Sequence, residues 1–315
     1  MTLTVVKPGL QTTLQGSPFS GHRHLGMPAA GAADCLSLAL ANHLVGNAAG
    51  AIAIEITLDE AKFTAGHPSA IALTGAAEYF RINEKDQPLH ELLYVKPGDE
   101  IDIGPAHLGC RSYLAVTGKI DAQSLLNGQS TYLGAGLGGF QGRALKVGDI
   151  VEWTSGSAPT RTGKKTPEGL RPIISEKYII RVTIGPEFSA LNSSSRKKLF
   201  ENKYTAGSRI NRMGLNLQAT VLETENGSQM QSAPVFPGTI QCPPDGEPFL
   251  LGPDAQTTGG YPRIAQVIRA DRHLIGQIRS GSEIQFVKTS NERATGIYRQ
   301  KLSLLTPWLG AISLW

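Results

Sequence analysis

The chain of 315 residues contains 40% hydrophobic and 18% charged residues and carries a formal net charge of +4. This composition is typical of a globular protein and excludes a disordered one, and the length favours two domains over one. A net charge this small, spread over this length, argues against nucleic acid as a partner.

Short β-strands separated by turns dominate the first half of the sequence. The 36 glycines and 19 prolines of the chain favour turns over long helices. Strands are expected at residues 3–6, 51–58, 70–73, 100–103, 111–116 and 150–153. One helix stands among them, because Asp34 can cap its start, leucines recur every fourth residue from Leu36, and Gly46 can end it.

A second β-rich unit follows a segment without apolar periodicity. Residues 156–172 are rich in Ser, Gly, Thr, Pro and basic residues, and we interpret them as a linker. Beyond it, strands are expected at residues 178–184, 238–242, 248–251, 264–268 and 283–287, with a helical turn at 193–200. The sequence therefore predicts a mostly β protein with a few short helices, whose two domains span residues 1–155 and 173–315.

The strongest candidate for a site is the segment 254–263 (DAQTTGGYPR), in which two threonines and two glycines precede an aromatic ring and a guanidinium. Glycines let a ligand approach the backbone, hydroxyl groups can hold oxyanions or amides, and arginine can grip a carboxylate. The alternative is a tight loop that only needs its glycines. On the first interpretation Thr257, Thr258, Tyr261 and Arg263 are catalytic, and Gly259 and Gly260 contact the substrate.

Three further clusters combine polar side chains with glycine or turn residues. Arg212 could bind a substrate anion or simply pair with a neighbouring carboxylate, and Gln241 could read a substrate amide. The glycine-rich stretch 130–143 resembles an anion-cradling loop, but it has neither the Walker spacing nor a dinucleotide fingerprint. The candidate substrate-binding residues in these clusters are Asn211, Arg212, Gln241, Ser130, Thr131 and Arg143.

Metal, disulfide and membrane patterns are weak. His22 and His24 alternate without a third ligand at recognisable spacing, so we interpret them as a polar loop and expect no metal. The cysteines at 35, 110 and 242 lie far apart and are expected to be buried thiols. Residues 1–10 lack a secretion-signal pattern and no apolar run could span a bilayer, so we expect a cytoplasmic protein that binds no membrane.

Taken together, these motifs resemble those of one known family. The matching segments are residues 8–15 (PGLQTTLQ), 40–47 (LANHLVGN), 73–76 (LTGA), 111–116 (RSYLAV), 130–131, 138–139 and 142–143, then 211–214 (NRMG), 240–246 (IQCPPDG) and 256–263 (QTTGGYPR). In this order they resemble the family of the 5-oxoprolinase C subunit and KipA-like proteins, also called allophanate hydrolase subunit 2-like, and the related carboxyltransferase region of urea amidolyase.

The resemblance implies two cyclophilin-like β-barrels and a KipI-like B subunit as partner. It implies one component of a 5-oxoprolinase-type amidohydrolase, which acts with the A and B subunits on a small polar amide and opens 5-oxoproline to glutamate. No biotinylation motif of the Ala-Met-Lys-Met kind is present, so no covalently bound cofactor is expected, and ATP would act at the level of the complex.

Two alternatives stay open. The first is a carboxyltransferase subunit that takes a carboxyl group from biotin on a separate carrier and acts on urea or a related amide. The second is a non-catalytic regulatory protein that binds a KipI-like kinase inhibitor.

The sequence departs from the family pattern at three places. After residue 15 the family has Asp-x-Gly-Arg, whereas this chain has Gly16 to Phe19 (GSPF), so one carboxylate and one guanidinium are missing. A Gly-Gly pair is Gly118-Lys119 here, and an arginine is replaced by Asn216. If the missing pair is catalytic, activity or substrate differs, and if it is a structural ion pair, little changes.

Overall fold

The computed structural model describes residues 1–156, 163–218, 221–225 and 229–314. The chain forms two compact units: unit 1 comprises Met1–Phe19, Asp34–Ile174 and Leu305–Ile312, and unit 2 comprises Ser20–Ala33, Ser175–Leu304 and Ser313–Trp315. The sequence predicts residues 20–33 in the first domain and 305–312 in the second. In the structure residues 20–33 belong to unit 2 and residues 305–312 belong to unit 1. The predicted linker at 156–172 falls partly on residues 157–162, outside the described residues.

Long-range contacts within each unit explain why these two segments belong to the unit that is farther from them along the chain. In unit 2, Ala30 N donates to Pro253 O at 2.9 Å and Arg212 Nη2 donates to Gly31 O at 2.6 Å. In unit 1, the rings of His43 and Trp308 lie 4.9 Å apart. Such contacts leave no local signal in the sequence, so composition alone assigns both segments to their neighbours along the chain.

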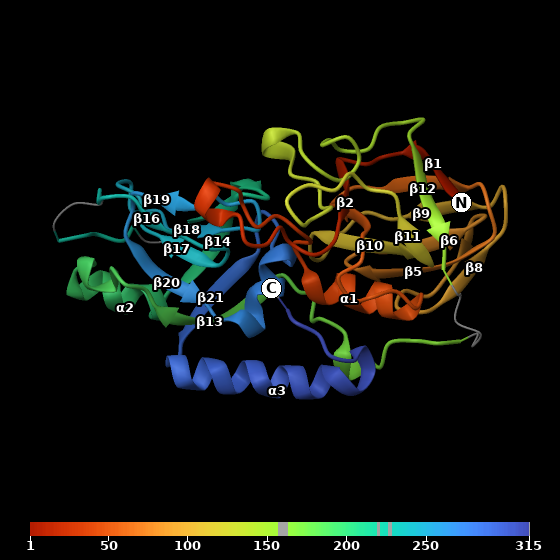
Figure 1. Cartoon of the computed structure of the whole chain (residues 1–315). Helices are drawn as coiled ribbons and strands as arrows, with labels where there is room; N and C mark the ends of the chain where they lie inside the picture. Colours follow the sequence, from red (N-terminus) through yellow and green to blue (C-terminus); the bar gives the residue numbers. More distant parts are fainter. Residues whose placement is uncertain (157–162, 219–220, 226–228, 315) are drawn as a thin grey trace. The chain divides into compact units, whose positions relative to one another are not determined.

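Unit 1 is built from two antiparallel sheets (Figure 1). The seven-stranded sheet has the order β11–β12–β1–β4–β9–β6–β7, and the five-stranded sheet has the order β2–β3–β10–β5–β8. The strands are β1 (Thr2–Lys7), β2 (Gln11–Gln15), β3 (Ala53–Thr57), β4 (Ala61–Ala65), β5 (Ser69–Gly75), β6 (Phe80–Ile82), β7 (Lys85–Asp86), β8 (Leu93–Val95), β9 (Glu100–Ile103), β10 (Arg111–Val116), β11 (Gly118–Ile120) and β12 (Ile150–Ser155).

The chain changes sheet between the consecutive strands β1 and β2. The turn between them contains Gly9, whose φ is +66° and where a Cβ would come within 2.6 Å of the carbonyl oxygen of Glu60. Only glycine fits such a turn without strain. The turn therefore lets β1 pair with β4 and β12 while β2 pairs with β3.

The two faces of the five-stranded sheet differ in chemistry. One row across four strands enters the apolar core and is fully buried: Leu14, Ile54, Leu114 and Leu73. Because side chains alternate between faces, the adjacent row lies on the opposite face, and it is polar yet equally buried: Thr13, Glu55, Tyr113 and Thr74. The helix α1 (Cys35–Leu44) lies against β5 and β10, and Thr74 Oγ1 donates to Ser37 O on it at 2.8 Å.

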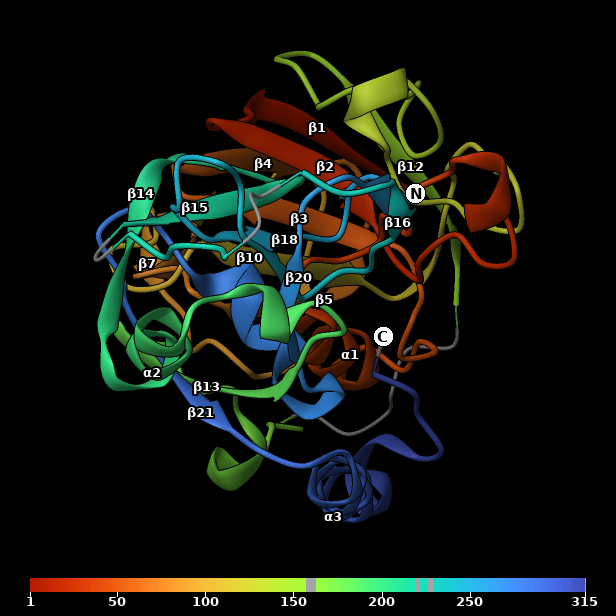
Figure 2. The same ribbon diagram turned by 90° about the vertical axis from the view of Figure 1, so that its left-hand side faces the viewer.

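Unit 2 is a closed barrel of seven strands in the order β13–β20–β17–β18–β15–β14–β21 (Figure 2). Its strands are β13 (Lys177–Ile184), β14 (Lys203–Asn211), β15 (Gly214–Gln218), β17 (Thr239–Gln241), β18 (Phe249–Leu251), β20 (Arg263–Val267) and β21 (Glu283–Lys288). A short separate ribbon pairs β16 (Ala233–Pro234) with β19 (Thr258–Gly259). The mostly β architecture that the sequence predicts is confirmed, and two strands, at 100–103 and 111–116, have the predicted bounds.

The helices agree with the sequence in part. Asp34 caps α1 by accepting hydrogen bonds from the backbone of Leu36 and Ser37, and α2 (Ser193–Glu201) lies at the predicted helical turn. The structure adds α3 (Asn291–Leu309), which has 19 residues and is not among the few short helices predicted. Gly296 and Pro307 within it, and its few buried residues, explain why no apolar stripe marks it in the sequence.

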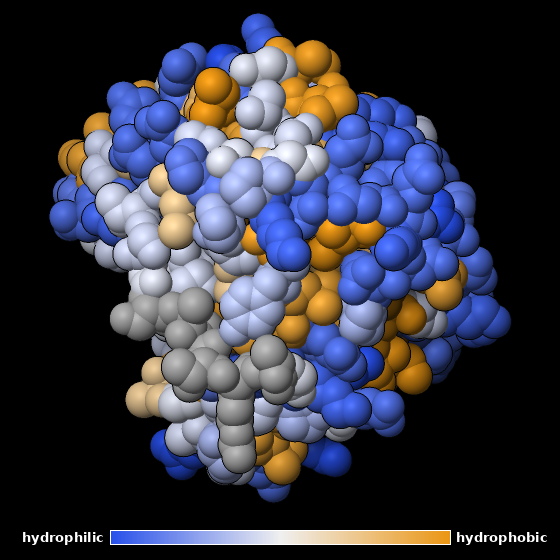
Figure 3. All heavy atoms as spheres, turned by 90° about the vertical axis from the view of Figure 1, so that its right-hand side faces the viewer, coloured by the Kyte–Doolittle hydropathy of each residue, from blue (hydrophilic) through white to orange (hydrophobic). Residues whose placement is uncertain are grey.

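The surface is hydrophilic over much of the face shown in Figure 3, with apolar areas between the polar ones. Exposed apolar residues of unit 1 include Leu10 and Val147. In the described part of the chain, no helix has the length and apolar character to cross a membrane. All three cysteines are buried, as predicted.

Candidate functional site

The predicted catalytic segment 254–263 lies in unit 2, where it links the barrel to the β16–β19 ribbon. Thr258 and Gly259 form β19, and Thr258 is exposed beside its register partner Pro234. Tyr261 is 39% exposed. Val235 N donates to Thr257 O at 3.0 Å, which continues the pairing of the ribbon. Thr258 and Tyr261 are therefore at the surface of unit 2, and Thr257 is half-buried.

Gln241, at the end of the barrel strand β17, anchors this segment. Its side chain is buried, its Nε2 donates to Tyr261 O at 3.2 Å, and its Oε1 accepts from Gln256 Nε2 at 3.4 Å. A Cβ on Gly259 would come within 2.6 Å of Gln241 Nε2, so glycine is needed for this close approach. The structure thus brings Gln241 together with the predicted catalytic segment.

Arg263 makes a bidentate ion pair with Glu187. Its Nε and Nη2 lie 2.8 and 2.6 Å from the two carboxylate oxygens, and its Nη1 donates to Pro234 O at 2.8 Å. Hydrogen bonds from the guanidinium hold the pKa of Glu187 below its usual value. Arg263 therefore ties β20 to the ribbon that carries Thr258, and its guanidinium is already occupied by a carboxylate.

Arg212 also makes a bidentate ion pair, and this pair is more deeply buried than the pair of Arg263 and Glu187. Its Nε and Nη2 lie 2.9 and 2.8 Å from the carboxylate of Asp254, and both side chains are 4% exposed. The neighbouring Asn211 folds its side chain into the β14–β15 turn, where Oδ1 accepts from Met213 N at 2.7 Å. Asn211 therefore holds a local turn, and Arg212 joins segments of unit 2 that are far apart in the sequence.

The glycine-rich cluster of unit 1 is also internally bonded. Ser130 and Thr131 are fully buried, and their hydroxyl groups donate to Ser17 O and Leu14 O, each at 3.0 Å. A Cβ on Gly139 would collide with Thr131 Oγ1, which explains the glycine there. Arg143 instead pairs with Asp149, with its Nη2 2.9 Å from the carboxylate.

The positions that depart from the family pattern are tightly packed. Gly16 N donates to Ser130 Oγ at 3.0 Å, and Phe19 is 4% exposed, with its ring against Gly128. Gly118 has φ +113° and its N–H donates to Asn47 Oδ1 at 3.0 Å. Asn216 is buried and donates to Glu247 at 3.3 Å. Each of these four positions is therefore packed or hydrogen-bonded within its own unit.

Two groups of polar residues were not predicted. The first is the pair of carboxylate partners: Glu187 lies outside every predicted cluster, and Asp254 lies in the predicted segment 254–263 but has no role assigned to it from the sequence. The second is a buried network in unit 1: Tyr113 Oη donates to Glu55 Oε2 at 2.8 Å and accepts from Asp34 N at 2.7 Å, and burial raises the pKa of Tyr113 far above its usual value. The alternation of Arg111 and Tyr113 in a buried strand is the signal that points to this network.

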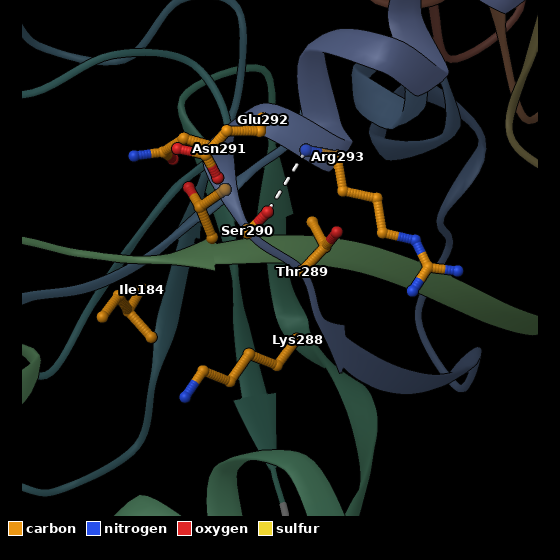
Figure 4. Close-up of a pocket in the computed structure, with 8 residues that line it drawn as sticks. Ile184, Lys288, Thr289, Ser290, Asn291, Glu292 and Arg293 are labelled. Atoms are coloured by element: carbon orange, nitrogen blue, oxygen red, sulfur yellow. Dashed lines mark hydrogen bonds between the residues drawn. The ribbon is translucent and has the colours of Figure 1, made fainter.

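A cavity of about 610 Å³ opens where β21 meets α3 (Figure 4). It is lined by Thr183, Ile184 and residues 288–293, and Arg293 N donates to Ser290 Oγ at 3.2 Å. None of the predicted site residues lines it. Among the described residues, no group of three or more His, Cys, Asp or Glu side chains could hold a metal ion.

Comparison with known families identifies the lineage of this fold. The family profile described as "Carboxyltransferase domain, subdomain A and B" matches residues 25–288. The chain belongs to this carboxyltransferase domain family. Within it, the chain is 35% identical to the C subunit of 5-oxoprolinase from Escherichia coli over 93% of both chains. It is 33% identical to urea amidolyase of Lachancea kluyveri over 92% of this chain but 17% of that protein.

A solved structure resembles this chain over nearly its full length. The crystal structure of the K. lactis urea amidolyase superposes on 98% of this chain with a TM-score of 0.92 and 28% identity. The chain spans 20% of that protein's length. The resemblance read from the ordered motifs is thereby confirmed.

Proposed function

We propose that this chain is the C subunit of a 5-oxoprolinase-type complex, which opens 5-oxoproline to glutamate with ATP. The observation that carries the proposal is the 35% identity to the 5-oxoprolinase C subunit over 93% of both chains. The same chain corresponds to only about a fifth of the urea amidolyases that it resembles. A KipI-like B subunit and an A subunit are the proposed partners, and ATP acts at the level of the complex.

The proposed substrate contacts lie on the exposed side of the β16–β19 ribbon. Thr258 and Tyr261 supply exposed hydroxyl groups there, Thr257 beside them supplies a half-buried one, and Arg263, paired with Glu187, lies at the base of the ribbon. Developing negative charge on an amide oxygen is stabilised best by groups that are already fixed in place. The pair with Glu187 and the bond to Pro234 fix Arg263 in this way.

Partners are required because the candidate site lacks a complete catalytic set. Its members in the described chain include no nucleophile with an adjacent general base. The test is to mix the purified chain with the A and B subunits, 5-oxoproline and ATP, and to measure glutamate. We expect turnover by the full mixture and none by this chain alone, and turnover by the chain without partners would refute the proposal.

Arg263→Ala tests the assigned role of this residue in the same mixture. We expect turnover to fall about 30- to 1,000-fold, whereas the loss of a partly solvated ion pair costs about 1 kcal/mol of stability. Thermal unfolding measured in parallel separates the two effects. Unchanged turnover in a folded variant would assign Arg263 to loop structure alone.

A carboxyltransferase acting on urea or a related amide is the second candidate. The TM-score of 0.92 to the K. lactis urea amidolyase favours it. In this case biotin is carried on a separate protein. Incubation with carboxybiotin and urea distinguishes the two candidates, because only a carboxyltransferase would consume carboxybiotin when urea is added.

A further inference from the structure

Arg23 differs from the arginines that the sequence predicts as site residues, because it has no carboxylate partner among the described residues. Arg143, Arg212 and Arg263 each bind an aspartate or glutamate. Arg23 lies in a single helical turn, η1 (Arg23–Leu25), in the part of unit 2 that the sequence assigned to the first domain. The sequence predicts a polar loop here and no role for its arginine.

The contacts of Arg23 place it beside the predicted catalytic segment. Its Nη2 donates to Val235 O at 2.5 Å and lies 3.5 Å from Gln256 O, while its guanidinium carbon lies 5.2 Å from the centre of the Phe236 ring. Val235 itself donates through its N–H to Thr257 O, and Gln256 directly precedes Thr257 in the chain. The guanidinium therefore lies next to Thr257, held by two carbonyl groups and a ring.

One nitrogen of this guanidinium is left without a partner. Nη1 of Arg23 is shielded from solvent and makes no hydrogen bond within the described chain, and the same holds for Nδ1 of the adjacent His22. Buried polar atoms are nearly always hydrogen-bonded, and a buried cation is costly unless an anion accompanies it. Burial also lowers the pKa of Arg23, with no carboxylate to oppose the effect. Both observations indicate a cation whose anion is supplied from outside unit 2's own side chains.

We infer that Arg23 is the anion-binding residue of the candidate site and that it binds the carboxylate of a small substrate. A guanidinium attracts a carboxylate by its charge and donates hydrogen bonds to it, and Nη1 is the donor of Arg23 left for this contact because Nη2 already donates to Val235 O. The inference deepens the proposed function and rests on it, because 5-oxoproline carries a carboxylate beside its lactam, whereas urea carries none. Arg23 would hold the carboxylate while Thr257 and Thr258 face the amide.

The experiment compares ligands with and without the carboxylate. Calorimetric titration of the complex with 5-oxoproline and with 2-pyrrolidinone, its analogue without the carboxylate, measures the contribution of the charge. We expect Arg23→Gln to weaken 5-oxoproline binding about 10- to 100-fold and to leave 2-pyrrolidinone binding unchanged. Arg23→Lys keeps the charge but loses the planar guanidinium. Its affinity for 5-oxoproline should therefore lie between those of the wild type and Arg23→Gln.

Arg269→Gln is the matched control. Arg269 also contacts a ring and a carbonyl group, with its guanidinium 5.0 Å from Tyr298 and its Nε 2.6 Å from Leu314 O, and its removal changes the net charge equally. The complex with the Arg269→Gln variant should bind 5-oxoproline with the same affinity as the wild-type complex. Unchanged 5-oxoproline affinity in folded Arg23→Gln and Arg23→Lys, or equal loss for both ligands, would overturn the inference.

A second probe separates this inference from the proposed function. Acetate titration of the wild-type and Arg23→Gln complexes needs no turnover. Arg23-dependent acetate binding without glutamate production would support the anion site and reject the 5-oxoprolinase assignment. Glutamate production that is insensitive to Arg23→Gln would support the assignment and reject the anion site.

Discussion

The polar clusters of the two units have similar compositions and different structures. Each combines hydroxyl groups, consecutive glycines and an arginine. In unit 1 the hydroxyls of Ser130 and Thr131 are fully buried and donate to the backbone carbonyl groups of Ser17 and Leu14. In unit 2 Thr258 and Tyr261 are exposed on a ribbon beside a guanidinium, Arg23, that lacks an anion. Solvent exposure and the presence of bonding partners therefore distinguish a structural cluster from a candidate site, whereas amino-acid composition does not.

The largest effect is expected from breaking the buried pair of unit 2. Arg212→Leu leaves the carboxylate of Asp254, 4% exposed, without its bidentate partner. Removing one member of a buried pair costs about 3–5 kcal/mol, because the other charge stays buried. Urea unfolding of the variant measures the loss. The double variant Arg212→Leu/Asp254→Leu should regain part of the stability, and a single variant as stable as the wild type would contradict the structural role of the pair.

The sequence predicts the strands better than the roles of charged residues. Strand 111–116 and the Asp34 cap follow from local alternation and capping chemistry, and both are confirmed. The pairing of Arg263 with Glu187 depends on residues 76 positions apart, and the sequence around either one contains no sign of it. No role for Arg23 follows from the sequence for a related reason. The lack of a partner becomes visible only when all the neighbours of a residue in space are known.

A smaller effect is expected from Ser130→Ala in unit 1. Ser130 Oγ accepts from Gly16 N and donates to Ser17 O, each at 3.0 Å, so the change leaves a buried backbone N–H without a partner. Such a loss costs about 1–3 kcal/mol. Ser155→Ala, which removes an exposed hydroxyl from the same unit, is the control for urea unfolding. Equal stabilities of the two variants would remove the claim that the cluster of unit 1 is structural.

Glu187→Gln should have a still smaller effect that depends on pH. The pKa of Glu187 is depressed in the folded state by its hydrogen bonds from Arg263. Its carboxylate therefore contributes stability above the unfolded-state value of 4.5, and this contribution is lost as the pH falls through the lower folded-state pKa. We expect the variant to be less stable than the wild type by about 1 kcal/mol at pH 7 and equally stable at acidic pH. A stability difference independent of pH would mean that the ion pair contributes nothing.

The smallest effect is expected from Asp149→Asn in unit 1, where the partner Arg143 has a side chain 30% exposed. Asp149 also accepts from Lys146 N at 2.7 Å, and an asparagine oxygen can keep that turn contact. The charge is lost together with one acceptor oxygen for Arg143, and water and salt already screen part of this partly exposed interaction. The thermal midpoint should therefore fall by at most about 1–2 °C, and by less still in about 0.5 M salt. Measured beside Arg212→Leu, this variant sharpens the contrast between the units, because both remove a bidentate pair of arginine and aspartate and differ in burial. A loss as large as that of Arg212→Leu would show that exposure does not set the energetic weight of these pairs.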